Sequence, residues 1–274
     1  MLKKRLGSGG MGRVYEAADA ALDRRVAVKL IRNDLLGSTE AAERFKREAR
    51  IAAGFVHPNV VTVHDFGLSQ PGRAFLVMEL LEGVTLRQHL RERKRLEVRR
   101  AIEILRGVCS ALESAHRRQL VHRDLKPENI FLAGTDAGEV VKVLDFGIAK
   151  SVVTVPRRSD FDTGRGVLLG TPRYMAPEQL RGETAHPAWD TWAIAVIAYE
   201  MLTGAHPSAP PGGLTSRGTD AIGGRFSPVG AHLPGAPRSW QGFFERALAL
   251  EPERRPRSPG SFFSEVERVL TMES

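Results

Sequence analysis

The sequence predicts an α+β protein of two lobes, in which a small antiparallel β-sheet lobe with one helix precedes a larger, mainly helical lobe. Short apolar segments separated by Gly- and Pro-containing turns fill most of residues 1–80, which is typical of a sheet. After Glu82-Gly83 the apolar residues recur at three- and four-residue spacing, which is typical of helices. The 274 residues are long for one compact core and suit two lobes.

The first lobe, taken as residues 1–80, begins with three predicted strands and a glycine turn. One helix is predicted over residues 39–55, because Ser38 and Thr39 are good N-cap residues and an apolar stripe follows them. That stripe includes Phe45, Ala49 and Ala52. Two further strands are predicted over residues 60–63 and 74–78.

The second lobe, taken as residues 81–270, is predicted to contain a long amphipathic helix followed by two short strands. The apolar positions of the helix are Ile102, Leu105, Val108, Leu112 and Ala115, and the strands cover residues 129–132 and 140–144. Residues 148–175 show no periodicity, and a loop of that length in a folded domain is usually functional. More helices are predicted over residues 190–202, 239–250 and 261–270, around an irregular segment at 205–237.

Composition limits the classes of partner. Lys and Arg outnumber Asp and Glu by 40 to 32, which gives a formal charge of +8 and suits anionic partners. The basic residues are spread along the chain with one local cluster at residues 91–95, so we do not expect a nucleic-acid partner. Hydrophobic residues make up 42% of the chain, which argues against disorder.

The single cysteine, Cys109, forms no internal disulfide and lies in a helical apolar pattern, so we expect it to be a small buried side chain. Residues 1–5 run into glycines and not into an apolar stretch, so no signal peptide is predicted. The longest apolar run, residues 192–199, is too short to cross a bilayer. We therefore expect a cytoplasmic protein without a membrane segment in this chain.

A glycine motif near the N-terminus, Gly7-Ser8-Gly9-Gly10-Met11-Gly12-Arg13-Val14, is suited to binding phosphates, because glycines let backbone amides approach phosphate oxygens. A flexible turn is the simpler interpretation, and a dinucleotide-binding fold is another. The dinucleotide motif needs a helix directly after the glycines, whereas Val14-Tyr15-Glu16-Ala17 continues as a strand. The motif therefore predicts two strands joined by a lid over a nucleotide.

Lys29 ends the apolar segment Val26-Ala27-Val28. A solvated lysine at a sheet edge is one interpretation, but a charge among apolar neighbours needs a partner. Glu48 lies beside the inward stripe of the predicted helix, and we predict that it pairs with Lys29, with Glu43 as the rival. The pair would hold the ammonium against nucleotide phosphates.

The most specific motif is Val121-His122-Arg123-Asp124-Leu125-Lys126-Pro127-Glu128-Asn129. Asp124 can accept the proton of a substrate hydroxyl, and Lys126 can reach a transferred phosphoryl group. Asn129 supplies a neutral oxygen ligand suited to Mg²⁺. An ordinary polar loop between a helix and a strand would not explain these residue types in this order.

A second polar motif, Asp145-Phe146-Gly147, follows a predicted strand, where a carboxylate is well placed to hold Mg²⁺ bridging two phosphates. The same tripeptide occurs at Asp65-Phe66-Gly67, before the boundary between the lobes. We interpret Asp65 as a turn residue and Asp145 as the metal ligand. Downstream, Ala176-Pro177-Glu178 supplies a carboxylate that Arg255 could bind as a buried bidentate ion pair.

Taken together, these motifs resemble the eukaryotic-type (Hanks-type) protein kinase superfamily, from Leu6 to about Leu270. The bacterial serine/threonine kinase group is the most similar, because of His57-Pro58-Asn59-Val60-Val61 and Tyr174-Met175-Ala176-Pro177-Glu178-Gln179. The resemblance implies a bilobal protein kinase-like fold spanning residues 1–270. It also implies an ATP-dependent protein serine/threonine kinase that uses Mg²⁺, with Mn²⁺ as an alternative, and that acts on proteins including its own activation loop.

The resemblance further implies the nucleotide site. Met78 would be the gatekeeper, residues 79–81 the hinge that meets adenine, and Phe131 the floor beneath the base, with Val14 and Ala27 as the roof. The full predicted set is Leu6, Gly7, Ser8, Gly9, Gly10, Met11, Gly12, Val14, Ala27, Lys29, Met78, Glu79, Leu81, Phe131 and Asp145. The predicted catalytic set is Lys29, Glu48, Asp124, Lys126, Asn129 and Thr171, and the predicted metal ligands are Asn129 and Asp145.

Two residues indicate the class of hydroxyl and the control of activity. The segment that contains Lys126 resembles that of serine/threonine kinases, and Thr171 would form hydrogen bonds with Asp124 and Lys126 as in those kinases. Arg123 would bind a phosphate on the activation loop, which offers Ser151, Thr154, Ser159 and Thr163. Thr163 best matches the phosphorylated position by its distance from Thr171.

Two other classes of protein remain as alternatives. A non-catalytic pseudokinase usually lacks the lysine, the catalytic aspartate or the metal aspartate, and all three are present here. A small-molecule phosphotransferase usually lacks Ala-Pro-Glu and a long activation segment, and this chain has both. Protein substrates are therefore expected, and an activating homodimer is left open.

Overall fold

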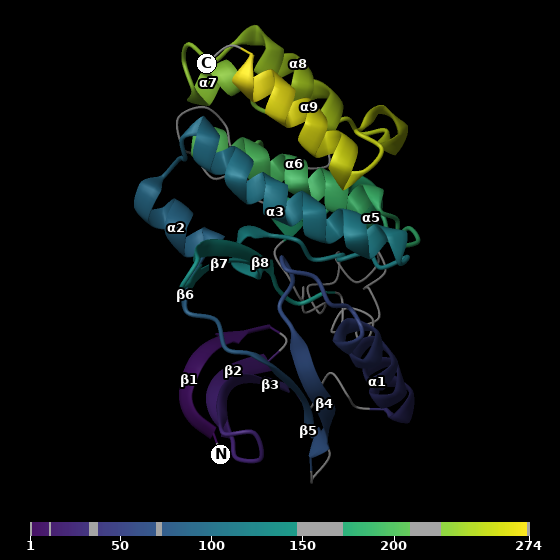
Figure 1. Ribbon diagram of the computed structural model, residues 1–274. Coiled ribbons are helices and arrows are strands. Elements are labelled where there is room, and N and C mark those ends of the chain that lie inside the picture. Colours follow the sequence, from purple (N-terminus) through teal and green to yellow (C-terminus); the bar gives the residue numbers. More distant parts are fainter. Residues whose placement is uncertain are drawn as a thin grey trace.

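A five-stranded antiparallel sheet forms the small lobe, with the strand order β1-β2-β3-β5-β4 (Figure 1). The strands are β1 (Leu2–Gly9), β2 (Gly12–Asp19), β3 (Arg24–Ile31), β4 (Val63–Ser69) and β5 (Arg73–Glu79). The computed structural model describes residues 2–10, 12–32, 38–69, 73–146, 172–208 and 226–272. Met11, Thr171 and the activation-loop residues between 147 and 170, Thr163 among them, lie outside the described residues.

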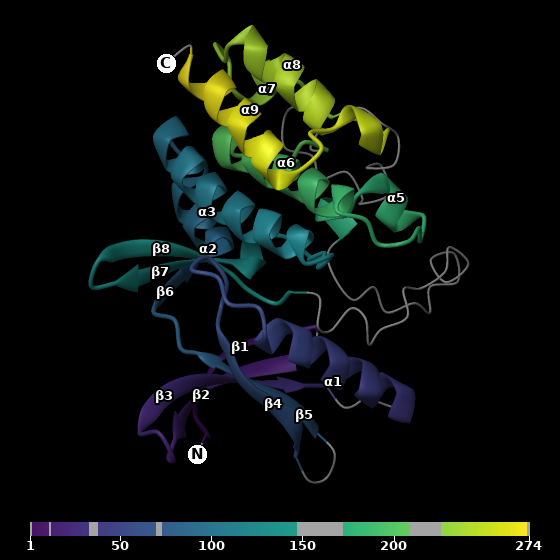
Figure 2. The same cartoon turned by 45° about the vertical axis from the view of Figure 1, so that its right-hand side comes forward.

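Helix α1 (Thr39–Ala53) lies beside this sheet (Figure 2). It begins as the sequence predicts, because the Ser38 side chain accepts a hydrogen bond from the Ala41 N–H and caps the first turn. Its buried residues, Ala41, Phe45 and Ala49, join the core formed by β3 and β5. The apolar stripe of the sequence therefore identified the buried face of this helix.

The large lobe begins with a three-stranded sheet of order β6-β7-β8, and two of its helices, α2 and α3, come between β6 and β7 along the chain. The strands are β6 (Gly83–Thr85), β7 (Ile130–Thr135) and β8 (Gly138–Val143). The helices are α2 (Leu86–Arg93), α3 (Val98–Arg117), α5 (Pro177–Leu180), α6 (Ala188–Thr203), α7 (Val229–His232), α8 (Arg238–Ala247) and α9 (Pro259–Thr271). Short 3₁₀ turns are η2 (Pro127–Asn129), η3 (Pro172–Tyr174) and η5 (Pro252–Arg254).

The large lobe is organised around α6. This helix is buried along almost its whole length, as expected for a helix that is apolar on every side. Helix α3 packs against α6 and α9, and α8 packs on the outer side of α6 (Figures 1 and 2). The apolar residues form two separate cores, one for each lobe. This architecture confirms the predicted α+β class, with a sheet lobe followed by a helical one.

The strand predicted over residues 60–63 is wrong. Strand β4 begins only at Val63, and Val60 forms an isolated parallel bridge with Val143 of the large lobe. The Val61 N–H donates to the Val143 carbonyl, and the Val143 N–H donates to the Asn59 carbonyl. Because these backbone groups bond to β8, they are not available to β5. The segment therefore links the two lobes.

The interpretation of Asp65 as a turn residue is also wrong. Asp65 lies within β4, next to a register shift between Val63 and Asp65. Its carboxylate accepts a hydrogen bond from the N–H of the adjacent Phe66. The side chain therefore acts locally on an exposed part of the strand. Within the described part of the chain, no helix is both long enough and apolar enough to cross a membrane.

Candidate active site

A cleft of about 510 Å³ lies between the two lobes and brings most of the predicted nucleotide residues together. The predicted residues that line it are Leu6, Gly7, Ser8, Gly9, Gly10, Gly12, Val14, Ala27, Lys29, Met78, Glu79, Leu81, Asp124, Lys126, Asn129, Phe131 and Asp145. Leu80, which belongs to the predicted hinge, also lines the cleft. Four further lining residues were given no role at the nucleotide site by the sequence, namely Val61, Thr85, Glu128 and Leu144. Val61 and Glu128 belong to motifs and Leu144 directly precedes one, and that was the available signal.

The glycines that line the cleft have two different uses. A Cβ atom on Gly12 would lie 2.0 Å from the carbonyl oxygen of Leu30, so a side chain would clash with the backbone of β3. A Cβ atom on Gly7 or Gly9 would meet nothing within 4 Å. Gly12 is therefore required by the packing of β2 on β3. Gly7 and Gly9 leave open space over the cleft, which suits the close approach of a ligand.

Lys29 is buried, with its ammonium 2.7 Å from Oδ2 of Asp145. The predicted partner was Glu48, and in this structure that pairing is wrong. The Glu48 carboxylate lies 4.0 Å from the Arg123 guanidinium and lines a second cavity of about 180 Å³ that Met78, Asp145 and other residues share. The buried Lys29 ammonium needs one close carboxylate, and Asp145 at the end of β8 supplies it.

The polar residues of the turn around η2 are bonded to one another. The Lys126 ammonium lies 2.8 Å from Asp124 Oδ2. The Asn129 amide nitrogen donates to the Asp124 carbonyl at 2.8 Å. Since that bond commits the NH₂ group, Oδ1 is the Asn129 atom suited to ligate a metal. Asn129 is only 8% exposed, so its geometry is fixed by the surrounding protein.

The backbone that carries Asp124 is anchored to helix α6 through Asp190, which is 1% exposed. One carboxylate oxygen of Asp190 accepts from the His122 N–H at 2.8 Å, and the other accepts from the Arg123 N–H at 3.0 Å. Arg123 adopts a left-handed conformation with φ 65°, and its carbonyl accepts from the Gln179 amide. These bonds hold a conformation that non-glycine residues rarely adopt.

Asp145 also has a left-handed backbone, with φ 56°. The next residue, Phe146, packs edge-on against Phe55 and at a tilt against the His122 ring. This packing turns the chain directly after β8 and leaves the Asp145 carboxylate on the cleft. Asp145 and Asn129 thus offer a charged and a neutral oxygen in one cleft. This donor set fits a hard divalent cation.

At the opposite end of the cleft, the side chain of Glu79 bridges the lobes. Its Oε1 accepts from the Thr62 N–H at 2.7 Å and lies 2.8 Å from the Lys142 ammonium of β8. Burial alone would raise the pKa of Glu79, but the Lys142 and Thr62 bonds outweigh burial and lower the pKa. The carboxylate is thereby held ionised at the segment that connects the lobes.

The predicted ion pair between Glu178 and Arg255 is present and buried. The two guanidinium nitrogens lie 2.6 and 2.9 Å from the two carboxylate oxygens, in a bidentate arrangement. Arg255 also donates to the carbonyls of Ala249 and Leu250, and its guanidinium lies over the Trp192 ring at 4.8 Å. The pair joins α5 to the segment between α8 and α9.

Comparison with known protein families matches residues 1–257 to the protein kinase domain. The chain belongs to the protein kinase family. Protein kinases use ATP and a divalent metal ion and act on protein substrates. The bilobal fold expected of a protein kinase domain is present.

The kinase domain is similar to named bacterial proteins. It is 40% identical over 272 residues to serine/threonine-protein kinase PknA of Mycobacterium tuberculosis, with 98% of this chain and 60% of that protein covered. It is 37% identical over 279 residues to serine/threonine-protein kinase pkn3 of Myxococcus xanthus, with 96% of this chain and 48% of that protein covered. The chain thus spans three fifths or less of the length of these relatives.

Among solved structures, the kinase domain is similar to the crystal structure of the PknI kinase domain of Mycobacterium tuberculosis. The TM-score is 0.75 at 26% identity, and the match covers 98% of this chain and 95% of that one. These similarities support the predicted bacterial serine/threonine kinase group.

Proposed function

We propose that this kinase domain transfers the γ-phosphoryl group of ATP to Ser and Thr hydroxyls of proteins, its own activation loop among them. The observation that carries the proposal is that Lys29, Asp124, Lys126, Asn129 and Asp145 all line one cleft between the lobes. A protein that only binds partners has no need to keep these five residue types together. The predicted domain spans residues 1–270, with the lobes dividing at residues 80 and 81.

Each residue has a proposed role in positioning or charge neutralisation, which phosphoryl transfer requires more than covalent chemistry. Asp124 orients the acceptor hydroxyl and accepts its proton. Lys126, 2.8 Å from Asp124, reaches the transferred group. Lys29 and the glycine segment hold the other phosphates, with Ala27 and Val14 above the adenine and Phe131 below it.

Asn129 and Asp145 are the proposed ligands of Mg²⁺, with Mn²⁺ as an alternative, because both present oxygen to the cleft. The ion supplies charge neutralisation for the phosphate oxygens. The Lys29–Asp145 ion pair positions both side chains on the cleft.

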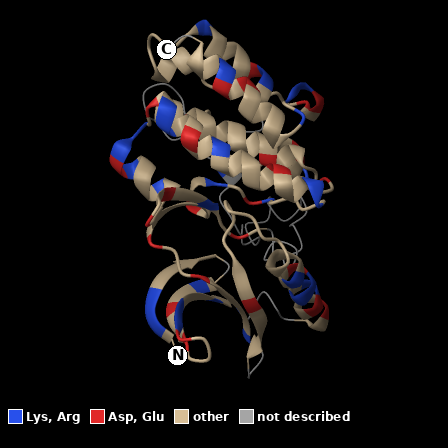
Figure 3. Ribbon diagram, in the orientation of Figure 1, with Lys and Arg blue, Asp and Glu red and all other residues tan. Residues whose placement is uncertain are grey.

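The class of acceptor hydroxyl and the regulation of activity are inferred from the sequence. Lys126 and Thr171 indicate Ser and Thr acceptors, and Arg123 would bind a phosphate on Thr163. Pairing of two copies during activation is part of the proposal, since loop phosphorylation in trans needs a second copy. ATP-dependent chemistry also favours a cytoplasmic location. Figure 3 shows acidic and basic residues interspersed on both lobes, which favours protein over nucleic-acid partners.

The decisive experiment measures incorporation of labelled γ-phosphate into protein and small-molecule acceptors. We expect Asp124→Asn and Lys29→Ala to abolish incorporation into protein. The chain also offers a matched control, because Asp145→Asn removes the negative charge of the proposed metal ligand, whereas Asp65→Asn changes the second Asp-Phe-Gly in β4, which does not line the cleft. Full activity of Asp124→Asn, or equal loss in the two Asp→Asn variants of these tripeptides, would contradict the assignment.

A further inference from the structure

Arg87 lies in the first turn of α2, where a capping box fixes the start of the helix. The Thr85 side chain accepts from the Gln88 N–H, and the Gln88 side chain accepts from the Thr85 N–H. A cation in the first turn is unfavourable for the helix itself, because the positive end of the helix dipole lies there. Arg87 therefore does not stabilise α2 through the helix dipole, and its contacts with other elements must explain its position.

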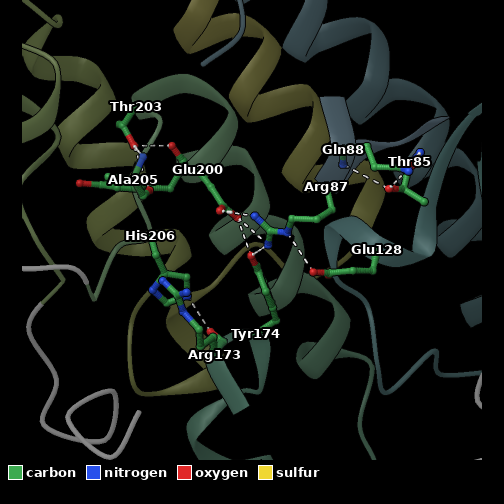
Figure 4. A network of polar contacts seen from close by, with 11 residues as sticks. Thr85, Arg87, Gln88, Glu128, Arg173, Tyr174, Glu200, Thr203, Ala205 and His206 are labelled. Carbon is green, nitrogen blue, oxygen red and sulfur yellow. Dashed lines mark hydrogen bonds and ion pairs between the residues drawn. The ribbon is translucent and has the colours of Figure 1, made fainter. Parts of the chain in front are cut away.

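The guanidinium of Arg87 binds three partners from three different elements (Figure 4). Its Nε lies 2.9 Å from Glu128 of η2, and one terminal nitrogen lies 2.7 Å from Glu200 of α6. The other terminal nitrogen donates to the hydroxyl of Tyr174 in η3. Tyr174 in turn donates to Glu200 at 2.5 Å. The planar fork of arginine places its donors on three separate nitrogens, so it can reach partners that lie farther apart than the single ammonium of lysine can bridge.

The part of the network formed by Arg87, Glu200 and Tyr174 is largely shielded from water, whereas the side chain of Glu128 is 45% exposed. The side chain of Arg87 is 18% exposed and that of Glu200 is 13% exposed. Burial alone would lower the pKa of Arg87, but the interactions with Glu200, Tyr174 and Glu128 together outweigh burial and raise the pKa. Arg87 therefore remains charged while holding its partners. In a partly buried site, such charge-assisted bonds resist competition from water.

Two of the three partners of Arg87, Glu128 and Tyr174, belong to segments close to Asp124. Glu128 lies between Lys126 and Asn129 along the turn, and it lines the nucleotide cleft. Tyr174 lines a smaller cavity on the other side of Asp124 and Lys126. One guanidinium thus connects the turn that carries the transfer residues to the segment that follows Thr171.

Tyr174 is held from its other side as well. Its ring packs edge-on against His206 at 5.6 Å, and the His206 ring donates to the carbonyl of Arg173 at 2.8 Å (Figure 4). Tyr174 is 5% exposed. With the ring fixed by His206 and the hydroxyl fixed by Arg87 and Glu200, η3 has little freedom to shift relative to Asp124.

We propose that Arg87 is a positioning residue for the protein acceptor, acting through Glu128 and Tyr174 to fix the surface on which a Ser or Thr hydroxyl approaches Asp124. This inference rests on the proposed kinase function. Arg87 does not itself line the nucleotide cleft, and of its three partners only Glu128 does. Loss of Arg87 is therefore expected to change acceptor kinetics more than ATP binding. The KM for ATP and the kinetic parameters for the acceptor therefore respond differently.

The test compares Arg87→Met with Arg91→Met, the same substitution at an exposed position of the same helix. Dephosphorylated casein is the acceptor. For Arg87→Met we expect kcat/KM for casein to fall by about 10- to 100-fold, since misplacement by about 1 Å can cost that much, with a much smaller change in KM for ATP. Arg91→Met behaves as wild type. Arg87→Lys restores only part of the loss, because it retains the charge and not the fork.

Unchanged casein kinetics in Arg87→Met would overturn the proposal. So would a parallel loss for casein and ATP with a lowered melting temperature, because that indicates only a general structural role. If Arg87→Met does not fold, Tyr174→Phe removes one hydroxyl and leaves the ring. We then expect kcat/KM for casein, and not KM for ATP, to fall by about 2- to 10-fold. If kcat/KM for casein is unchanged in Tyr174→Phe, the proposal is overturned.

Amide hydrogen exchange separates this inference from the proposed function. In Arg87→Met, the amides around Glu128 and Tyr174 should exchange faster than in Arg91→Met, whether or not the protein is active. If the wild-type chain phosphorylates no acceptor, the kinase proposal fails. The exchange result still decides whether Arg87 holds the segments around Glu128 and Tyr174, since unchanged exchange overturns that premise and with it the positioning role.

Discussion

Replacing Glu178 with Gln removes one charge from the buried Glu178–Arg255 pair with almost no change in shape. The Arg255 side chain is 0% exposed and the Glu178 side chain is 4% exposed, so water cannot replace the lost carboxylate. Arg255 keeps its bonds to the carbonyls of Ala249 and Leu250, but the buried charge has lost its bidentate counter-ion. Breaking a buried pair in this way costs about 3–5 kcal/mol.

The expected loss is large enough to measure by thermal or urea unfolding of the whole chain. In proteins of this size a loss of 1 kcal/mol lowers the melting temperature by about 2–4 °C, so a fall of roughly 6–20 °C is expected for Glu178→Gln. Glu267→Gln is the matched control, because Glu267 pairs with Arg106 at 2.7 Å on the surface. Exposed pairs contribute less than about 1 kcal/mol.

A melting temperature for Glu178→Gln within the range of Glu267→Gln would refute this reasoning. A double variant, Glu178→Leu with Arg255→Met, gives a second comparison. It removes both charges, so it should unfold less easily than Glu178→Gln alone. It also leaves the carbonyls of Ala249 and Leu250 without their donor, at about 1–3 kcal/mol each, so we expect it to remain below wild type.

Three further predictions concern single residues. His206 is buried, and burial together with the nearby charge of Arg173 lowers its pKa from 6.5 to about 4. The stability that neutral His206 contributes is full above pH 6.5 and is lost as the pH falls towards 4, by up to about 3 kcal/mol. His206→Gln should therefore show a smaller fall in the free energy of unfolding over this range in urea titrations. Gly12→Ala should destabilise the chain by about 1–3 kcal/mol because of the clash with β3. Asp190→Asn should reduce kcat by about 10²-fold through misplacement of the catalytic backbone.

Each of these predictions has a control. An equal pH dependence in wild type and His206→Gln would rule out His206 as the titrating group. Gly9→Ala places a Cβ in open space, so its melting temperature should equal that of wild type, and equal melting temperatures for both glycine variants would contradict the packing argument. For Asp190→Asn, an unchanged kcat would show that its bonds to the His122 and Arg123 amides are dispensable.

Most residues that line the cleft were predicted from the sequence, because they belong to motifs that residue type and spacing alone make recognisable. The partner of Lys29 was not predicted correctly. The stripe through Phe45 and Ala49 defined the buried face of α1, but it did not define the position of the helix relative to the sheet. Glu48 lies at the edge of that face, so a small displacement decides whether it approaches Lys29 or Arg123.

Helix α2 and Arg87 were missed for a different reason. The helix has only eight residues, and Leu86 and Leu90 are its buried positions, so its periodicity is weak. The signal that could have identified it is the pair Thr85 and Gln88, which has the spacing of a capping box. The partners of Arg87 are up to 113 residues away, at distances along the chain that no local pattern encodes.

At Arg123 and Asp145, whose backbone is left-handed, the residue that would favour stability differs from the residue that would favour the proposed activity. A side chain in that conformation costs about 1–2 kcal/mol that glycine would avoid. Selection for thermal stability alone would favour glycine at both positions. Glycine would remove the guanidinium and the carboxylate, so selection for catalysis retains them. A thermostable descendant of this domain is therefore expected to gain its stability elsewhere, and a descendant that has lost its activity is expected to lose these two side chains early.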